Sequence, residues 1–327
     1  MNLRDYDSLD FIKHKTICKH KTFLLKYLSE RFSYFSPEEW VGMLALNRIF
    51  LNGNLIQEDR QIFPNDEIIC YLERFEAEEP SVDTNYSVLY EDEYLLIVNK
   101  PGDIPVHPAG RYRKNNLLSI LEVDFSCKLY PCHRLDRETS GVCLFAKDAQ
   151  TSQKIAFMFQ QRKIHKEYRV FVYGDFPEQI VLEGWIEADM YSSIRKKKVL
   201  NQKNLPKDNT NLLELKKADS MGYAITRFDK LNFSAGISML AAFPLTGRIH
   251  QIRASLFSYG FPLLGDKIYG RDEGVFLKFI ESGWKDEFAE ILGHNRQALH
   301  AYQLEFSHPI SMQKMKIISP IPPDLHF

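Results

Sequence analysis

The segment PCHRLDRETSG, residues 131–141, places seven polar or charged side chains directly ahead of an apolar run, VCLFAK at 142–147. An apolar run of this kind, bounded by polar residues, is typical of a buried strand. Functional residues are often found on loops that a rigid element positions. The segment therefore predicts a turn that presents reactive side chains at the start of a core strand.

The stretches on either side of this segment predict a sheet. YLLIVNK at 94–100 is typical of a strand, and KEYRVFVYG at 166–174 is rich in β-branched and aromatic residues. A helix is expected between them over 148–164, and strands without regular helical crossovers dominate from there onward. We therefore predict an α+β fold in which a catalytic domain, residues 86–327, is built on a mixed, mainly antiparallel β-sheet.

Residues 1–80 predict a separate, small α/β domain. Apolar residues at helical spacing extend over 22–50, and Ser36 followed by Pro and Glu is typical of a helix start. Asn52-Gly53 predicts a hairpin. The predicted order of two helices followed by a short hairpin resembles the S-four-like RNA-binding module. A generic helix-plus-hairpin domain is the alternative. The acidic, polar stretch 72–86 is expected to link the two domains.

The composition limits the classes of function. The chain of 327 residues has a net charge of −1, so a role on nucleic acid needs local basic patches, for which 13–26 and 195–217 are candidates. Its five cysteines are irregularly spaced, without a CxxC pair, which disfavours a disulfide framework or a zinc site. The absence of a long apolar run and of an apolar signal core predicts a cytoplasmic protein without a membrane span.

Four polar stretches join strand-like segments, at 100–108, 133–141, 166–170 and 245–253. They read KPGDIPVHP, HRLDRETSG, KEYRV and LTGRIHQIR, and in this order they resemble the RluA-type RNA pseudouridine synthases. The resemblance covers about residues 86–327. It implies the pseudouridine synthase fold, an RNA substrate and a reaction that isomerises uridine without a metal or a cofactor. The S-four-like module commonly accompanies this domain in members that act on large-subunit ribosomal RNA.

Isomerising uridine requires a carboxylate that is nucleophilic or stabilises charge at the ribose. Asp136 and Glu138 both fit by residue type, and the resemblance selects Asp136 as the essential aspartate and leaves Glu138 as a surface or loop residue. The resemblance also gives Asp136 a cationic partner, Arg253. We predict a salt bridge between the two, in which the guanidinium fork holds the carboxylate bidentately.

The resemblance implies roles for further residues. Tyr168 is expected to stack on the target uracil and to move a proton at carbon 5, and is the third predicted catalytic residue after Asp136 and Arg253. Arg134 is expected to fill the gap that a flipped base leaves in the stack. The other predicted substrate-binding residues are His133, Thr139 and Arg248. For His133 a structural hydrogen bond is favoured over proton transfer, and Thr139 to Gly141 are expected to form the turn that aims Asp136.

Several alternatives remain at this point. The target could be transfer RNA rather than ribosomal RNA, or the chain could be a non-catalytic RNA-binding assembly factor on the same fold. A retaining glycosidase would need Asp136 and Glu138 about 5 Å apart, which nothing in the sequence indicates. The segments 190–217 and 271–297 are undecided between loops, helices and insertions. We expect a monomer whose partner is RNA.

Overall fold

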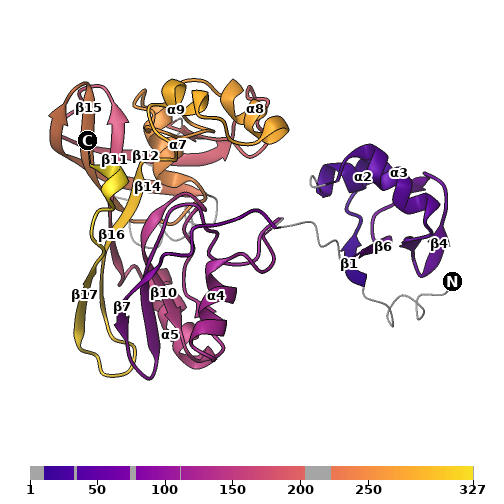
Figure 1. The fold of residues 1–327 in the computed structure, drawn as a ribbon, viewed down its shortest axis with the longest axis horizontal. Coiled ribbons are helices and arrows are strands. Elements are labelled where there is room, and N and C mark those ends of the chain that lie inside the picture. Colours follow the sequence, from indigo (N-terminus) through magenta and orange to yellow (C-terminus); the bar gives the residue numbers. More distant parts are fainter. Residues whose placement is uncertain (1–10, 33–34, 74–78, 111, 203–221, 327) are drawn as a thin grey trace. The chain divides into compact units, whose positions relative to one another are not determined.

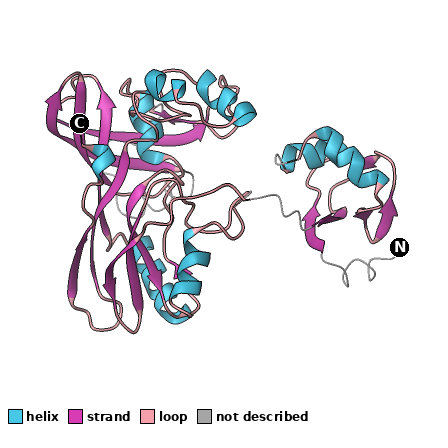
Figure 2. Ribbon diagram, viewed as in Figure 1, coloured by secondary structure: helices cyan, strands magenta, loops and turns pink. Residues whose placement is uncertain are grey.

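The computed structural model describes residues 11–32, 35–73, 79–110, 112–202 and 222–326, and the chain divides into two compact units, Met1–Pro80 and Ser81–Phe327. Each unit has its own sheets and its own hydrophobic clusters (Figures 1 and 2). No helix in the part of the chain that the structure describes is long and apolar enough to cross a membrane.

The first unit packs two helices against a small antiparallel sheet. Its elements are β1 (Phe11–Ile17), β2 (Thr22–Phe23), α2 (Leu24–Arg31), α3 (Pro37–Ala45), β3 (Ile49–Leu51), β4 (Asn54–Ile56), β5 (Gln61–Ile62) and β6 (Glu67–Glu73). The main sheet has the order β1-β6-β3-β4, and β2 pairs with β5. The stretch 22–50 therefore contains two helices, as predicted, and short strands flank them.

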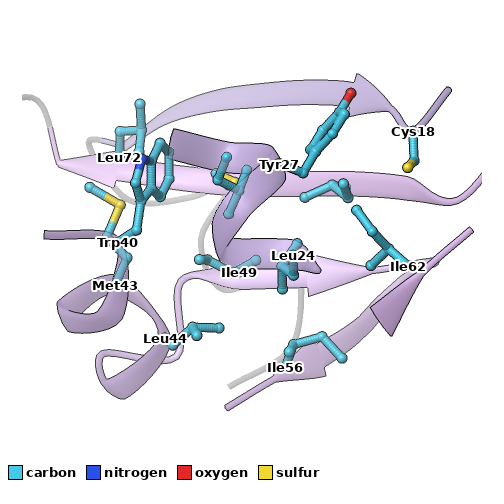
Figure 3. Close-up of a cluster of buried hydrophobic side chains, with 13 residues drawn as sticks. Cys18, Leu24, Tyr27, Trp40, Met43, Leu44, Ile49, Ile56, Ile62 and Leu72 are labelled. Atoms are coloured by element: carbon cyan, nitrogen blue, oxygen red, sulfur yellow. The ribbon is translucent and has the colours of Figure 1, made fainter. Parts of the chain in front are cut away.

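The helix start and the hairpin predicted for the first unit are both present in the structure. The Ser36 side chain accepts from the Glu39 backbone N–H at 3.2 Å, and the Glu39 carboxylate accepts from the Ser36 N–H at 2.6 Å, which confirms the helix start. Asn52 and Gly53 both have positive φ and connect β3 to β4, which confirms the hairpin. Trp40 and Ile49 are fully buried in the core between helices and sheet (Figure 3).

The second unit is built on a large, twisted sheet. Its strands are β7 (Ser87–Glu91), β8 (Leu95–Lys100), β9 (Tyr130–Pro131), β10 (Ser140–Ala146), β11 (His165–Tyr173), β12 (Gln179–Ala188), β13 (Lys198–Asn201), β14 (Tyr223–Ser234), β15 (Ile237–Pro244), β16 (Leu299–Ser307) and β17 (Lys314–Ile318). Within the described residues the order is β13-β12-β14-β15-β11-β16-β10-β8-β7, with β17 beside β16 and β9 beside β10. The paired strands are antiparallel except for β10 and β16, which confirms the mixed, mainly antiparallel sheet.

Helices cover this sheet and its edges. They are α4 (Leu117–Asp124), α5 (Ala149–Gln160), α7 (Gln251–Ser258), α8 (Gly274–Ser282), α9 (Glu287–Leu292) and the short 3-10 helix η1 (Pro323–Leu325). The stretch 271–297, left open by the sequence, contains α8 and α9, which bury Val275, Phe288 and Leu292 together. Of the other open stretch, 190–217, the structure describes 190–202, a turn followed by β13, and the remainder lies outside the described residues.

Strand β10 fixes the position of the polar segment that precedes it. Every residue of β10 is buried, as predicted for 142–146, and its first two residues pair in parallel with His300 and Ala301 of β16. Gly141 lies so close to β16 that an added Cβ would overlap the Ala301 backbone, and its φ is +110°. The glycine therefore lets two core strands approach at the point where the polar turn ends.

Candidate active site

A cavity of about 430 Å³ opens beside this turn in the second unit. Its walls come from the turn before β10, the end of α5, strand β11 and the stretch from β15 into α7. All seven residues that the sequence singled out line it: Asp136, Tyr168, Arg253, Arg134, His133, Thr139 and Arg248. Segments more than 100 residues apart in the chain thus contribute to one site.

Asp136 and Arg253 form an ion pair at the cavity. Arg253 Nη1 donates to Asp136 Oδ2 at 2.7 Å, which confirms the predicted salt bridge. Burial opposes ionisation of Asp136, but the charge of Arg253 and the hydrogen bond that it donates hold the pKa of the carboxyl below its usual value. Asp136 is therefore an anion at neutral pH, with one oxygen engaged by Arg253.

The predicted bidentate geometry is wrong, because the guanidinium fork of Arg253 faces a different carboxylate. Nε donates to Asp266 Oδ2 at 2.7 Å and Nη2 donates to Asp266 Oδ1 at 2.8 Å. Asp266 is fully buried, and its Oδ1 also accepts from the backbone N–H groups of Ile268 and Tyr269. Asp266 thus fixes the plane of the guanidinium, which leaves Nη1 for Asp136.

Sequence reasoning missed Asp266. Asp266 follows the apolar stretch FPLLG at 261–265. An acidic residue directly after such a stretch was the one feature of the sequence that could have marked it as a candidate. The pairing with Arg253 cannot be read from the sequence, because it depends on how this segment folds back on α7. The charge of Arg253 keeps the pKa of Asp266 below its usual value in spite of burial.

Backbone contacts hold the turn that carries Asp136. The Thr139 N–H donates to the Asp136 carbonyl at 3.1 Å, and the Thr139 hydroxyl accepts from Gln297 Nε2 at 2.5 Å. Lys100, fully buried, donates from Nζ to the carbonyl of Arg137 at 2.8 Å and to two carbonyls of its own loop. Thr139 therefore helps to fix the conformation of the turn, and it also lines the cavity.

Glu138 lies in the turn before β10, as expected for a loop residue, but its side chain is not at the surface. Its side chain is 13% exposed, and it accepts from Lys267 Nζ at 2.7 Å and from Arg137 Nη2 at 3.0 Å. Burial opposes its ionisation, yet these two cations hold its pKa below the usual value. Because Glu138 is engaged by two cations and does not line the cavity, it is poorly placed to act as a second acid beside Asp136.

Tyr168 reaches the cavity from β11, next to an irregularity in the pairing of β11 with β16. Its pKa is raised above the usual value by burial and by the negative charge of Asp136. Among the described residues its hydroxyl has no hydrogen-bond partner. The site thus presents an aromatic ring and a protonated phenol close to an ionised carboxylate.

The remaining residues at the cavity divide into structural and exposed groups. His133 Nε2 accepts from the Leu144 N–H at 3.0 Å, which confirms a structural hydrogen bond, and burial lowers its pKa to about 4. His250 bonds the Tyr269 hydroxyl at 2.9 Å, and burial lowers its pKa to about 4.

Arg134 is exposed, and among the described residues it has no ion-pair partner. The backbone of Arg248 is fixed by Gln251 at 2.9 Å.

The described residues contain no group of three or more His, Cys, Asp or Glu side chains that could hold a metal ion. The polar groups around Asp136 are instead paired with each other or exposed to the cavity. The arrangement therefore combines a fixed carboxylate, its cation, an aromatic hydroxyl and an exposed arginine.

The known proteins that resemble this chain are described as pseudouridine synthases. A sequence model described as RNA pseudouridylate synthase matches residues 94–258. Yeast mitochondrial tRNA pseudouridine(32) synthase is 30% identical over 80% of this chain and 54% of its own length. Ribosomal large subunit pseudouridine synthase D of Xylella fastidiosa is 27% identical over 91% of this chain and 85% of its own length. Human pseudouridylate synthase RPUSD2 is 31% identical over 79% of this chain and 45% of its own length.

This chain therefore spans about half the length of the yeast and human relatives. Among solved structures, human RNA pseudouridylate synthase domain containing 1 superimposes with a TM-score of 0.54. The superposition covers 76% of this chain and 89% of that one, at 22% sequence identity, and it shows that the two proteins share a fold.

Proposed function

From the premise that the chain belongs to the RluA-type RNA pseudouridine synthases, we propose that it isomerises specific uridines in RNA to pseudouridine. The observation that carries this proposal is the ionised Asp136, held by Arg253 in the same cavity as Tyr168. No cofactor is required, because the isomerisation is redox-neutral and needs only a carboxylate, a cation and a group that moves a proton.

The proposed reaction exchanges one glycosidic bond for another. The bond between ribose C1′ and uracil N1 breaks, the base turns, and C1′ bonds to C5 of the uracil. N1 gains a proton and C5 loses one, so that product and substrate are isomers. Asp136 supports either of two routes to cleavage, by attacking C1′ or by removing a ribose proton to give a glycal, because both need the same ionised carboxylate.

Arg253 and Tyr168 assist these steps in different ways. Arg253 keeps Asp136 ionised and points one carboxylate oxygen, because Asp266 fixes the guanidinium. Tyr168 offers a ring face to the uracil and a hydroxyl that can take part in proton transfer at C5. Its raised pKa keeps the phenol protonated in the free protein, so that it first acts as a hydrogen-bond donor.

Access of the target uridine requires base flipping, because the reacting atoms lie within a cavity. Arg134 stands exposed at this cavity, two residues before Asp136, and a guanidinium there can fill the stack and contact phosphates. His133, Thr139 and Arg248 complete the proposed substrate-binding wall, with His133 acting through the position of its ring rather than as an acid.

We propose large-subunit ribosomal RNA as the target, with transfer RNA as the second candidate. The first is supported by a relative named for the ribosomal large subunit that this chain covers to 85% of its length. The second is supported by the mitochondrial tRNA enzyme of yeast, at 30% identity. A non-catalytic assembly factor is less well supported, because Asp136, Tyr168 and Arg253 are all present.

Residues 1–80 are proposed to be an S-four-like RNA-binding domain. Support comes from the two helices and the Asn-Gly hairpin of the unit, and from exposed lysines that include Lys15, Lys19 and Lys21. A cytoplasmic location is also part of the proposal, supported by the five free cysteines, which are usual in a reducing compartment. The proposal also includes a monomeric protein.

Gene deletion followed by transcriptome-wide mapping of pseudouridine tests this function and separates the two targets. We expect one or a few uridines of large-subunit ribosomal RNA to lose the modification and to regain it when the intact gene is restored. Loss confined to transfer RNA would replace the first target by the second. Unchanged pseudouridine at every position, together with an inactive purified protein on total RNA, would overturn the enzymatic proposal.

A further inference from the structure

A turn at residues 189–197, between β12 and β13, lies near the active site, because the charges of Arg253 and Asp136 act on its Lys196, and we call it the rim turn. Its base is anchored in the second unit. Ile194 is 2% exposed and packs with Ala254 and Tyr269. Lys197 is also buried, and its Nζ donates to Glu273 at 2.8 Å. The rim turn is therefore held by packing and by an ion pair.

Hydrogen bonds connect the end of the rim turn to the cavity wall. The Lys198 N–H, at the start of β13, donates to the Tyr269 hydroxyl at 2.9 Å. The same hydroxyl bonds His250 Nδ1 at 2.9 Å, and His250 lines the cavity. Lys196 precedes this connection by two residues. Partial burial, followed by the nearby charges of Arg253 and Arg137, lowers the pKa of Lys196, which shows that its ammonium lies within range of the site's cations.

The outward face of the rim turn combines cations with an exposed aromatic ring. Arg195 and Lys196 are exposed, and Lys196 Nζ lies 4.7 Å from the ring centre of Phe276. Tyr191 is 100% exposed and Met190 is 85% exposed. The Tyr191 side chain makes no packing contribution to the stability of the fold, because it is fully exposed on an anchored turn. A turn that carries both cations and an exposed aromatic ring has the features typical of a surface that binds single-stranded nucleic acid.

We propose that the rim turn binds the RNA strand that flanks the flipped uridine, with Lys196 and Arg195 on phosphates and Tyr191 stacked on a neighbouring base. The inference rests on the proposed function, which brings RNA to the cavity, and it adds a second contact surface outside the cavity wall. Charge favours this occupant, since two adjacent cations match a phosphate backbone. Such contacts would select substrates by an unpaired nucleotide beside the target.

The test uses the full chain and a twelve-nucleotide oligouridylate that contains 4-thiouridine, which cross-links to nearby side chains under near-ultraviolet light. Peptide mapping by mass spectrometry is expected to find a cross-link within 189–197. Affinity is then compared for Lys196→Gln, Tyr191→Ser and Lys314→Gln. Lys314 is an exposed lysine at the end of β17, outside the cavity lining, so that Lys314→Gln makes the same change in charge as Lys196→Gln.

We expect Tyr191→Ser to weaken binding at least about 5-fold, the lower end for loss of one base stack. Lys196→Gln should reduce the slope of log affinity against log salt by about 0.7, the value for one phosphate contact on a single strand. Lys314→Gln should match the wild type. Cross-links confined to other peptides, or Lys196→Gln and Tyr191→Ser behaving like Lys314→Gln, would overturn the inference.

Pseudouridine formation on total RNA is measured in parallel, so that the two proposals fail separately. A protein that cross-links through the rim turn but forms no pseudouridine contradicts the proposed function and leaves the binding surface in place. A protein that forms pseudouridine while the rim-turn variants bind and turn over normally contradicts the binding surface alone.

Discussion

Arg253 lies between two carboxylates that differ in role and environment. Asp266 is fully buried and takes the guanidinium fork, whereas Asp136 faces the cavity and receives the remaining nitrogen. The single guanidinium of Arg253 therefore donates hydrogen bonds to both carboxylates. Asp136 stays ionised although Arg253 contacts only one of its two oxygens. Arginine suits this position because its planar group can serve two partners at fixed angles.

Replacing Asp266 with Asn tests whether it positions Arg253. Asn presents an amide N–H group to the guanidinium, so Arg253 should turn away from the geometry that serves Asp136. We expect kcat to fall about 100-fold, the usual effect of a misplacement near 1 Å, with little change in KM because Asp266 does not line the cavity. Steady-state kinetics on the mapped RNA measure both constants.

Asp272→Asn is the matched control for this variant. Asp272 is an exposed aspartate of the same segment, whose carboxylate caps the Gly274 N–H at 2.8 Å. It should keep kcat within a factor of about two, since Asn keeps an oxygen that can accept from the Gly274 N–H and exposed substitutions of this kind have small effects. An Asp266→Asn protein that folds and keeps its kcat would show that Arg253 needs no fixed plane.

Tyr168→Phe separates stacking from proton transfer at the same residue. The variant keeps the ring and removes the hydroxyl. If the phenol moves a proton at C5, kcat should fall by about 100- to 10,000-fold while RNA affinity stays unchanged. Single-turnover kinetics and a binding assay on the same RNA distinguish the outcomes. Equal losses of affinity and turnover would assign the residue to stacking alone.

At the scale of elements, the parallel contact between β10 and β16 places the catalytic turn. Ser140 pairs with His300 in this ladder, and the Ser140 hydroxyl also bonds His300 Nδ1 at 2.9 Å. The other ring nitrogen bonds the Ser319 carbonyl at 3.2 Å. His300 is fully buried, and burial lowers its pKa to about 4. A neutral histidine therefore links the start of β10 to β16 and to the segment after β17.

His300 predicts that acid destabilises the second unit. The folded pKa of about 4 lies below the ordinary value of 6.5, so the unfolded chain binds more protons between these two pH values. The stability due to a neutral His300 is present above pH 6.5 and is lost as the pH falls towards 4. At pH 5 the loss is about 2 kcal/mol by linkage.

Urea unfolding of wild type and His300→Gln at pH 7 and pH 5 measures this effect. Gln can donate and accept as the neutral ring does, but it does not titrate. The variant should therefore lose about 2 kcal/mol less than the wild type between the two pH values. His133 and His250 titrate in both proteins and cancel in the comparison. Identical losses in the two proteins would contradict a neutral, buried His300.

Seven of the residues that line the cavity were predictable, because they lie within short polar motifs that resemble those of a known family. Asp266 was not predicted, because its pairing with Arg253 depends on how the segment after α7 folds back on that helix. The burial of Glu138 was not predicted, because its partner Lys267 comes from a distant segment. Local signals such as the Ser36 cap were predictable, since they depend on neighbours within three residues.

At the scale of the whole molecule, a chain of net charge −1 must bind RNA through focused cations. Arg134 is exposed at the cavity, and Arg195 and Lys196 are exposed on the rim turn, whereas Lys100 and Arg253 are buried and hold the catalytic turn and the two carboxylates. The overall charge therefore says little about the surface that meets the substrate.

Binding of RNA to the full chain should accordingly depend on salt. Three or more phosphate contacts on a single strand give a slope of about −2 for log affinity against log salt concentration. Fluorescence anisotropy with the mapped RNA, from low to physiological salt, measures the slope. A slope near zero would contradict phosphate contacts by these cations.

Incubation of purified protein with RNA from the deletion strain measures whether the ionised Asp136 of this chain converts uridine to pseudouridine. Nucleoside mass spectrometry should detect new pseudouridine with the wild type. Asp136→Asn, which keeps the shape of the side chain but removes its charge, should lower the rate about a thousandfold or more. Wild-type rates for Asp136→Asn, or no pseudouridine with either protein, would contradict the account.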